Sequence, residues 1–273
     1  MFFRSEWVVI TGLLLLSFVA ANGQSYDSEV QSGVAAYRNS DYEQAIQHFR
    51  KATELDPGQS AAHLYLATCY VNQYIPGVES PDNLRAADQA IAQYQAVLDL
   101  DADRGSKINS TKGLAYLYLN MKKFEKAKEY YQKAAGLDGG DPENYYGIGV
   151  IDWTTSYETR MEARAKLGMA PGENLDAKND AQKKVCDELS VKNASAIEDG
   201  IDNLNKAIQL RPDYDDAMAY MNLMYREKAD LECETPGLRA EDLKTADEWV
   251  DRTLAVKKAK ANRHPAPTAP SPQ

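Results

Sequence analysis

The stretch DYEQAIQHFRKATELDP (residues 41–57) carries small and apolar side chains four and three residues apart, at Ala45, Phe49, Ala52 and Leu55. These steps place the four side chains on one face of a helix, and Pro57 ends that helix. The same order of a small residue, an aromatic or leucine, a small or β-branched residue and a leucine returns in AADQAIAQYQAVLDLDA (86–102), KFEKAKEYYQKAAGLDG (123–139) and AIEDGIDNLNKAIQLRP (196–212). Recurring amphipathic helices of one pattern predict an array of stacked units.

A helical segment with its own small residue precedes each copy, at Gly33, Ala67, Ala115 and Gly149. A fifth, weaker copy carries Asn222 and Ala246 in the equivalent places. The helix–turn–helix unit resembles the tetratricopeptide repeat, although the tryptophan usual near the start of the first helix is absent. The resemblance implies an all-α, right-handed α-solenoid across residues 24–256, with repeats at 26–59, 60–104, 108–141, 142–213 and 215–256. It implies a platform for protein–protein interaction rather than a particular chemistry.

Extra residues fall inside the turns of repeats two, four and five. Gly149 and Gly200 of repeat four are 51 residues apart, against 12 between Gly33 and Ala45 of repeat one. All the insertions should therefore project from one edge of the solenoid. Two interpretations stay open: this edge is a binding face, or the turns simply tolerate added length.

The longest insertion predicts a helical arm at residues 154–193. The first helix of repeat four continues to Gly168, MAPGEN (169–174) forms a turn, and residues 175–210 form a second helix with a break near Asn193. The arm should protrude by about 20 Å, with Tyr157, Met161 and Leu167 facing Val185 and Leu189. The alternative is a polar excursion without regular structure. The shorter insertions should lengthen the second helix of repeats two and five.

Residues 1–23 have the layout of a signal peptide: Arg4, then the apolar run WVVITGLLLLSFVAA (7–21), then small residues. We expect cleavage and export to a bacterial periplasm; the alternative is an uncleaved signal that anchors the chain in the membrane. An oxidising compartment permits a disulfide, and Cys186 and Cys233 lie in insertions on the same edge, one repeat apart. We therefore predict that these two cysteines pair.

The resemblance also implies a concave groove lined by the first helix of each repeat. Aligned positions give a protein-binding set of aromatic, aliphatic and amide side chains with two cations: Val34, Tyr37, Thr68, Asn72, Lys112, Tyr116, Asn120, Tyr146, Trp153 and Arg226. Such a surface suits an extended peptide or a partner helix. The alternative is that many of these residues pack inside the superhelix. Lys112 and Arg226 lie too far apart along the repeats to form the basic clamp with which family members hold a C-terminal carboxylate.

The formal charge of −10, from 41 acidic and 31 basic residues, argues against nucleic-acid binding. No metal, cofactor or catalytic motif is evident, and we predict a non-enzymatic scaffold or assembly factor. The alternatives are a structural cell-envelope protein held by its signal anchor, a non-catalytic subunit of an envelope enzyme, and an enzyme with a site among the insertions.

The C-terminal end of the chain gives two further expectations. Residues 257–273 should form a disordered Ala/Pro-rich tail, which could occupy an aromatic groove. Val250 and Leu254 of the last repeat lack a capping helix, and we expect them to support at most a weak homodimer.

Overall fold

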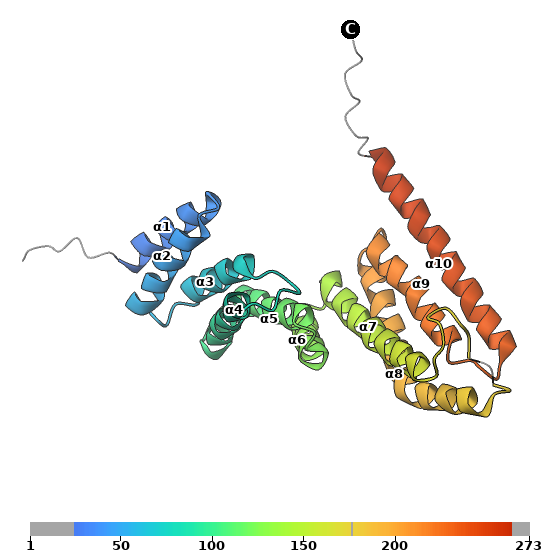
Figure 1. Cartoon of the computed structure of the whole chain (residues 1–273). Helices are drawn as coiled ribbons and strands as arrows, with labels where there is room; N and C mark the ends of the chain where they lie inside the picture. The colour runs from blue at the N-terminus through green and yellow to red at the C-terminus, as the bar shows by residue number, and fades with distance from the viewer. Residues whose placement is uncertain (1–24, 176, 264–273) are drawn as a thin grey trace, which may run out of the picture.

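The computed structural model describes residues 25–175 and 177–263. These residues form ten helices and no strand: α1 (Tyr26–Arg38), α2 (Tyr42–Leu55), α3 (Ser60–Gln73), α4 (Pro81–Asp99), α5 (Arg104–Asn120), α6 (Phe124–Leu137), α7 (Pro142–Lys166), α8 (Asp180–Leu210), α9 (Asp215–Ala229) and α10 (Pro236–Arg263). The helices follow one another in an elongated row, with α1 and α2 at one end and α9 and α10 at the other (Figure 1). The predicted all-α fold is confirmed.

Each helix packs on the next one along the chain, so that α1–α2, α3–α4, α5–α6, α7–α8 and α9–α10 form successive hairpins. The contact between α3 and α5 and that between α7 and α9 bring first helices of adjacent hairpins together. One apolar core runs through α1–α6 and reaches Ile151 of α7, and a second core joins α7–α10. No hairpin could bury its apolar face alone, and stacking covers that face.

The first and third hairpins turn in the same way. Ser40 and Lys122 adopt positive φ angles of 61° and 55°. The next N–H group, of Asp41 or Lys123, donates to the carbonyl of Ala36 or Tyr118 respectively, as the chain leaves the first helix. The longer turn of the second hairpin, residues 74–80, is held instead by buried Asn83. The Asn83 side chain accepts from the N–H of Ile75 and donates to the carbonyls of Ile75 and Val78, and this fixes the loop before α4.

The insertion of the fourth hairpin differs from our expectation in two respects. α8 begins at Asp180 rather than at residue 175, and it is unbroken at Asn193. The Asn193 side chain is buried and donates to the carbonyl of Ser156 on α7 at 3.0 Å. Because this hydrogen bond gives the amide a partner on the facing helix, Asn193 does not interrupt α8. Leu167, Val185 and Leu189 share one apolar cluster, as expected. Met161 lies outside that cluster, and Tyr157 stacks on Trp153 at 5.1 Å between ring centroids.

The arm is not a free projection, because its apolar cluster includes Leu231 and Cys233 from the turn between α9 and α10. α7 also packs directly on α9. The insertions of the fourth and fifth hairpins therefore cover each other.

The predicted tail begins later than expected, because α10 continues to Arg263. Residues 257–263 are rich in Lys and Ala, which favour helix, and the first proline comes only at Pro265. Residues 264–273 lie outside the described part of the chain, as do residues 1–23 with their predicted signal peptide. Leu254 is 60% exposed and Val250 is half-buried.

Candidate functional site

Two adjoining open pockets lie along the first helices of the first four hairpins. The N-terminal pocket, of about 440 Å³, is lined by Val34, Tyr37, Arg38, Phe49, Leu64, Tyr65, Thr68, Tyr94 and Asn109. The central pocket, of about 570 Å³, is lined by Val71, Tyr94, Lys112, Gly113, Tyr116, Leu119, Tyr131, Glu143, Tyr146, Gly147 and Val150. Tyr94 belongs to both, so the two pockets form one continuous groove from α1 to α7.

Aromatic rings from second helices form the floor of this groove. A Cβ atom at Gly113 would lie 2.4 Å from the Tyr94 ring, and one at Gly147 would lie 2.6 Å from the Tyr131 ring. Contacts this short are incompatible with any side chain unless the ring moves. The two glycines therefore leave gaps in the wall of first helices, through which Tyr94 of α4 and Tyr131 of α6 reach the groove.

Six of the ten predicted groove residues line these pockets: Val34, Tyr37 and Thr68 the N-terminal one, and Lys112, Tyr116 and Tyr146 the central one. Asn72 lies beside them, because its amide donates to the Tyr37 hydroxyl at 3.2 Å. Asn120 donates to the carbonyl of Tyr116. It lines a separate pocket of about 430 Å³ at the turn edge, next to Val78, Leu84 and Met121.

Trp153 and Arg226 line neither of these two pockets. Trp153 packs between Tyr157 and Tyr220, and Tyr220 also contacts Tyr146. These ring contacts join α7 to α9. Arg226 is bound to Asp247 of α10 at 2.7 Å. The groove, as these two pockets define it, runs from α1 to α7.

The charged groups of the central pocket are neutralised by ion pairs. Lys112 Nζ lies 2.5 Å from Asp141 Oδ2, and Glu143 accepts from Arg211 at 2.7 Å and from the Tyr214 hydroxyl at 2.6 Å. Burial, with the Glu143 carboxylate nearby, raises the pKa of Tyr131 to about 12. The Tyr131 hydroxyl is therefore protonated at neutral pH. A pocket of this kind favours an uncharged, largely apolar ligand with a few hydrogen-bonding groups.

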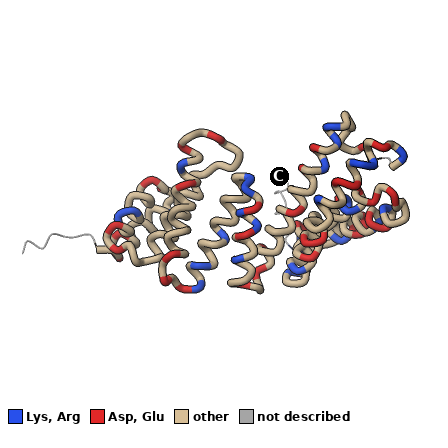
Figure 2. The backbone as a smooth tube through the Cα atoms, turned by 90° about the horizontal axis from the view of Figure 1, so that it is seen from below, with Lys and Arg blue, Asp and Glu red and all other residues tan. Residues whose placement is uncertain are grey.

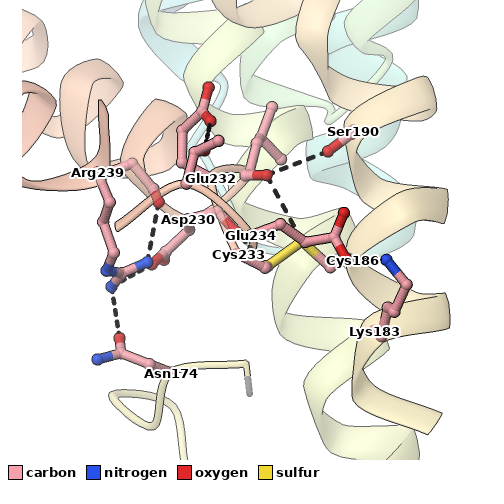
Figure 3. The surroundings of a disulfide bond; sticks show 12 residues. Asn174, Lys183, Cys186, Ser190, Asp230, Glu232, Cys233, Glu234 and Arg239 are labelled. Carbon is pink, nitrogen blue, oxygen red and sulfur yellow. Dashed lines mark hydrogen bonds and ion pairs between the residues drawn. A yellow bond between two sulfur atoms is a disulfide. The ribbon is translucent and has the colours of Figure 1, made fainter. Parts of the chain in front are cut away.

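A second cluster of interest joins the arm to the last hairpin (Figure 3). Cys186 of α8 is bonded to Cys233 of the α9–α10 turn, with 6.4 Å between the Cα atoms. Ser190 donates to the carbonyl of Leu231 in the same turn, and Lys183 pairs with Glu234. These contacts fasten α8 to the turn.

Buried ion pairs continue this junction on its other side. Arg160 makes two hydrogen bonds of 2.7 Å to the Glu227 carboxylate, and both side chains are buried. Asp230 accepts from Arg164 at 3.0 Å and from Arg239 at 3.1 Å, and Arg239 also reaches Asn174 in the turn after α7. Each charge has a partner of opposite sign on another segment, and the cluster therefore acts as a structural clamp.

One buried carboxylate lies where the two cores meet. Asp152 of α7 is 2.6 Å from Lys128 of α6. Burial raises the pKa of Asp152 to about 6, although the Lys128 ammonium acts in the opposite direction. This residue titrates close to neutral pH at the boundary of the two halves.

The described residues offer little material for catalysis. Cys69 is fully buried, and burial raises the pKa of its thiol to about 12, which makes it a packing residue rather than a nucleophile. No group of three or more His, Cys, Asp or Glu side chains within residues 25–175 and 177–263 is arranged to hold a metal ion. Across the same ranges, none of the helices is both long and apolar enough to cross a bilayer. Acidic and basic residues are interspersed along the helices (Figure 2).

Sequence reasoning did not identify the aromatic rings of second helices that line the pockets. Phe49, Tyr94 and Tyr131 follow the helical repeat pattern, which indicates packing, and Phe49 and Tyr94 are indeed buried as well as pocket-lining. The signal that could have found them is the pairing of each ring with a glycine on a facing helix: Gly33, Gly113 and Gly147.

Comparisons with known proteins agree with this architecture. Family models described as tetratricopeptide repeat match residues 36–73 and 113–141. No curated protein matches the sequence significantly. A crystal structure of MamA superposes with a TM-score of 0.58 at 16% identity, over 91% of this chain and 100% of that one.

Two further solved structures are similar. MamA from Desulfovibrio magneticus RS-1 gives a TM-score of 0.56 at 13% identity, over 87% of this chain and 98% of that one. YrrB, described as a TPR protein with an unusual peptide-binding site, gives 0.54 at 14% identity, over 88% and 93% respectively. At such low sequence identity these similarities show only that the fold is shared. Tetratricopeptide repeats are therefore present at residues 36–73 and 113–141, within a helical solenoid fold.

Proposed function

We propose that this chain is a non-enzymatic scaffold that binds an extended peptide or a helical segment of another protein in the groove between α1 and α7. The observation that carries this proposal is the continuity of two apolar pockets through Tyr94. Two neighbouring pockets can hold two anchor side chains of one ligand and so select a sequence. Exposed aromatic rings with few polar groups are the usual anchors of such interfaces.

The proposal includes the route and place of action. Residues 1–23 would act as a cleaved signal, and the mature chain would act in a bacterial periplasm. The disulfide between Cys186 and Cys233 supports an oxidising compartment, because such bonds are rare in reducing cytosol. Intact-mass measurement of the chain recovered from its native cells tests cleavage. Retention of residues 1–23 would favour the membrane-anchored alternative.

A peptide library provides the test of groove binding. Random peptides displayed on phage are selected on the chain, and their affinities are then measured for a Tyr37→Ala/Tyr116→Ala variant. Both tyrosines line the groove, and Tyr116 is 43% exposed, so its truncation should leave the fold intact. We expect the selected peptides to bind the variant at least about 10-fold more weakly, since two anchor contacts are lost.

A Tyr130→Ala variant serves as the matched control. Tyr130 lies on α6, packs on Tyr118 and lines neither pocket of the groove. Peptides should bind this control like the unmodified chain. Equal binding to the double variant would place the interaction elsewhere, and the first candidate would be the turn edge, where Asn83 holds the 74–80 loop with Ile75 and Val78 exposed.

A further inference from the structure

Residues 264–273 have a composition that matches the groove. Their sequence is HPAPTAPSPQ, with four prolines and no Asp, Glu, Lys or Arg. Proline fixes φ near −65° and favours an extended polyproline II conformation, and segments of this kind dock in grooves lined by aromatic side chains.

The central pocket offers the complementary surface. Tyr94, Tyr116 and Tyr131 present aromatic rings there, and Lys112 and Glu143 are already held in ion pairs. A charged ligand could pair with Lys112 or Glu143 only by displacing Asp141 or Arg211. A proline-rich segment without Asp, Glu, Lys or Arg side chains can bind mainly through apolar contact and hydrogen bonds from tyrosine hydroxyls.

The end of α10 lies near this pocket. Lys260 Nζ is 2.5 Å from the carboxylate of Asp215, the first residue of α9. The preceding residue, Tyr214, has its ring centroid 5.0 Å from that of Tyr146, which lines the central pocket. The last turn of α10 is therefore linked to the groove by only two side-chain contacts, Lys260 with Asp215 and Tyr214 with Tyr146. Ten residues in a polyproline II conformation span about 31 Å, which is ample for this separation.

We propose that residues 264–273 bind in the central pocket of the same molecule and act as an intramolecular ligand. This inference rests on the proposed function, because it fills the same groove. A tethered segment has an effective concentration on the order of 1 mM. A ligand from outside must displace this segment, and the apparent affinity of that ligand for the unmodified chain is therefore lowered.

The test compares the unmodified chain with a tail variant, Pro265→Ala/Pro267→Ala/Pro270→Ala/Pro272→Ala. The probe is a fluorescein-labelled peptide HPAPTAPSPQ, and binding is followed by fluorescence anisotropy. If the free peptide binds with a Kd of about 100 µM, a tether at about 1 mM weakens its apparent binding to the unmodified chain about 10-fold. We therefore expect the tail variant to bind the peptide about 10-fold more tightly than the unmodified chain.

Two controls locate the contact. Adding Tyr116→Ala to the tail variant should abolish most of the binding, whereas adding Tyr130→Ala should leave it unchanged. A peptide in which alanine replaces all four prolines should not bind. Equal loss with both tyrosine variants would overturn the assignment to the central pocket.

Other outcomes contradict the proposal in distinct ways. Equal affinity of the peptide for both chains would mean that residues 264–273 do not occupy the groove. A difference that appears only at high chain concentration would assign the segment to a second copy. Library peptides that bind the tail variant when HPAPTAPSPQ does not would remove this inference and leave the proposed function in place.

Discussion

In α1–α6 the groove stays open because rings from second helices reach it opposite glycines, as Tyr94 does at Gly113. In α7–α10, Trp153 and Tyr146 both pack edge-on against Tyr220, and Tyr146 also lines the central pocket. The second region is further tied by a disulfide and a buried arginine–carboxylate cluster. The same helix–turn–helix unit therefore builds a surface with open pockets in one half and a cross-linked block in the other.

This comparison suggests a division of labour along the chain. The first half leaves aromatic surface uncovered, as at Tyr116, and the proposed peptide binding would need such surface. The second half holds long helices against each other, and the insertions that lengthen them also supply the residues that join them, such as Arg160, Cys186 and Cys233. The fourth and fifth hairpins should therefore unfold as a unit, and their cross-links provide the largest expected effects on stability.

Removing one partner of the buried ion pair should be the most damaging change. Glu227→Ala leaves buried Arg160 with only its longer contact to Asp230, at 3.3 Å, and we expect a loss of about 3 kcal/mol in the free energy of unfolding. Urea denaturation followed by circular dichroism measures it. Glu129→Ala, which breaks the exposed pair with Lys133, is the control and should leave the denaturation midpoint unchanged. Equal effects of the two variants would mean that the cluster does not stabilise the second half.

Removing the disulfide should have the next largest effect. It closes a loop of 47 residues between Cys186 and Cys233, and such a bond stabilises by about 2–4 kcal/mol through the unfolded state. Cys186→Ser/Cys233→Ser should be destabilised by this amount. Hydrogen exchange should show faster opening in α8 and α9, with α1–α6 unaffected. Accelerated exchange throughout the chain would contradict the separation of the two halves.

The boundary between the halves should respond to pH through Asp152. Its pKa is raised from the ordinary value near 3.8 to about 6, so the folded state holds a proton that the unfolded state has released between these values. Its contribution to stability is complete below about pH 4 and is lost as pH rises through 6, by about 1–3 kcal/mol. Asp152→Asn cannot titrate. The difference in unfolding free energy between the two proteins should therefore vary between pH 4 and pH 7, and a constant difference would exclude this assignment.

Much of the fold could be predicted because its signals are local. The steps of four and three residues from Ala45 to Leu55 are read within one helix, and Pro142 and Asp141 mark the start of α7 by proline geometry and capping. The pairing of Cys186 with Cys233 was predicted from the expected oxidising compartment and from the rule that insertions inside hairpins share an edge. These inferences require no knowledge of which distant side chains meet.

The features that could not be predicted depend on distant partners. Asn193 looks like a helix-weakening residue until the carbonyl of Ser156, 37 positions away, accepts its hydrogen bond. Trp153 aligns with groove residues, and its packing on Tyr157 and Tyr220 could not be predicted from the alignment of the repeats. The floor of the groove was missed because Tyr94 reads as an ordinary packing residue without its glycine partner.

The smallest expected effect tests that glycine partnership directly. Gly113→Ala adds a Cβ 2.4 Å from the Tyr94 ring, which must move, and the overpacking cost of about 1–3 kcal/mol exceeds the gain in helix propensity of about 0.5–1 kcal/mol. Gly136→Ala in α6 is the matched control. No atom lies within 4 Å of its added Cβ, so that this variant should gain about 0.5 kcal/mol.

The two alanine substitutions should thus change the unfolding free energy in opposite directions. Only Gly113→Ala should weaken peptide binding, because the displaced Tyr94 ring narrows both pockets. Urea denaturation and peptide anisotropy on the same samples measure the two effects. If Gly113→Ala were as stabilising as Gly136→Ala and bound peptide normally, the Tyr94 ring would not need the gap, and the openness of the first half would have to come from the exposed tyrosines alone.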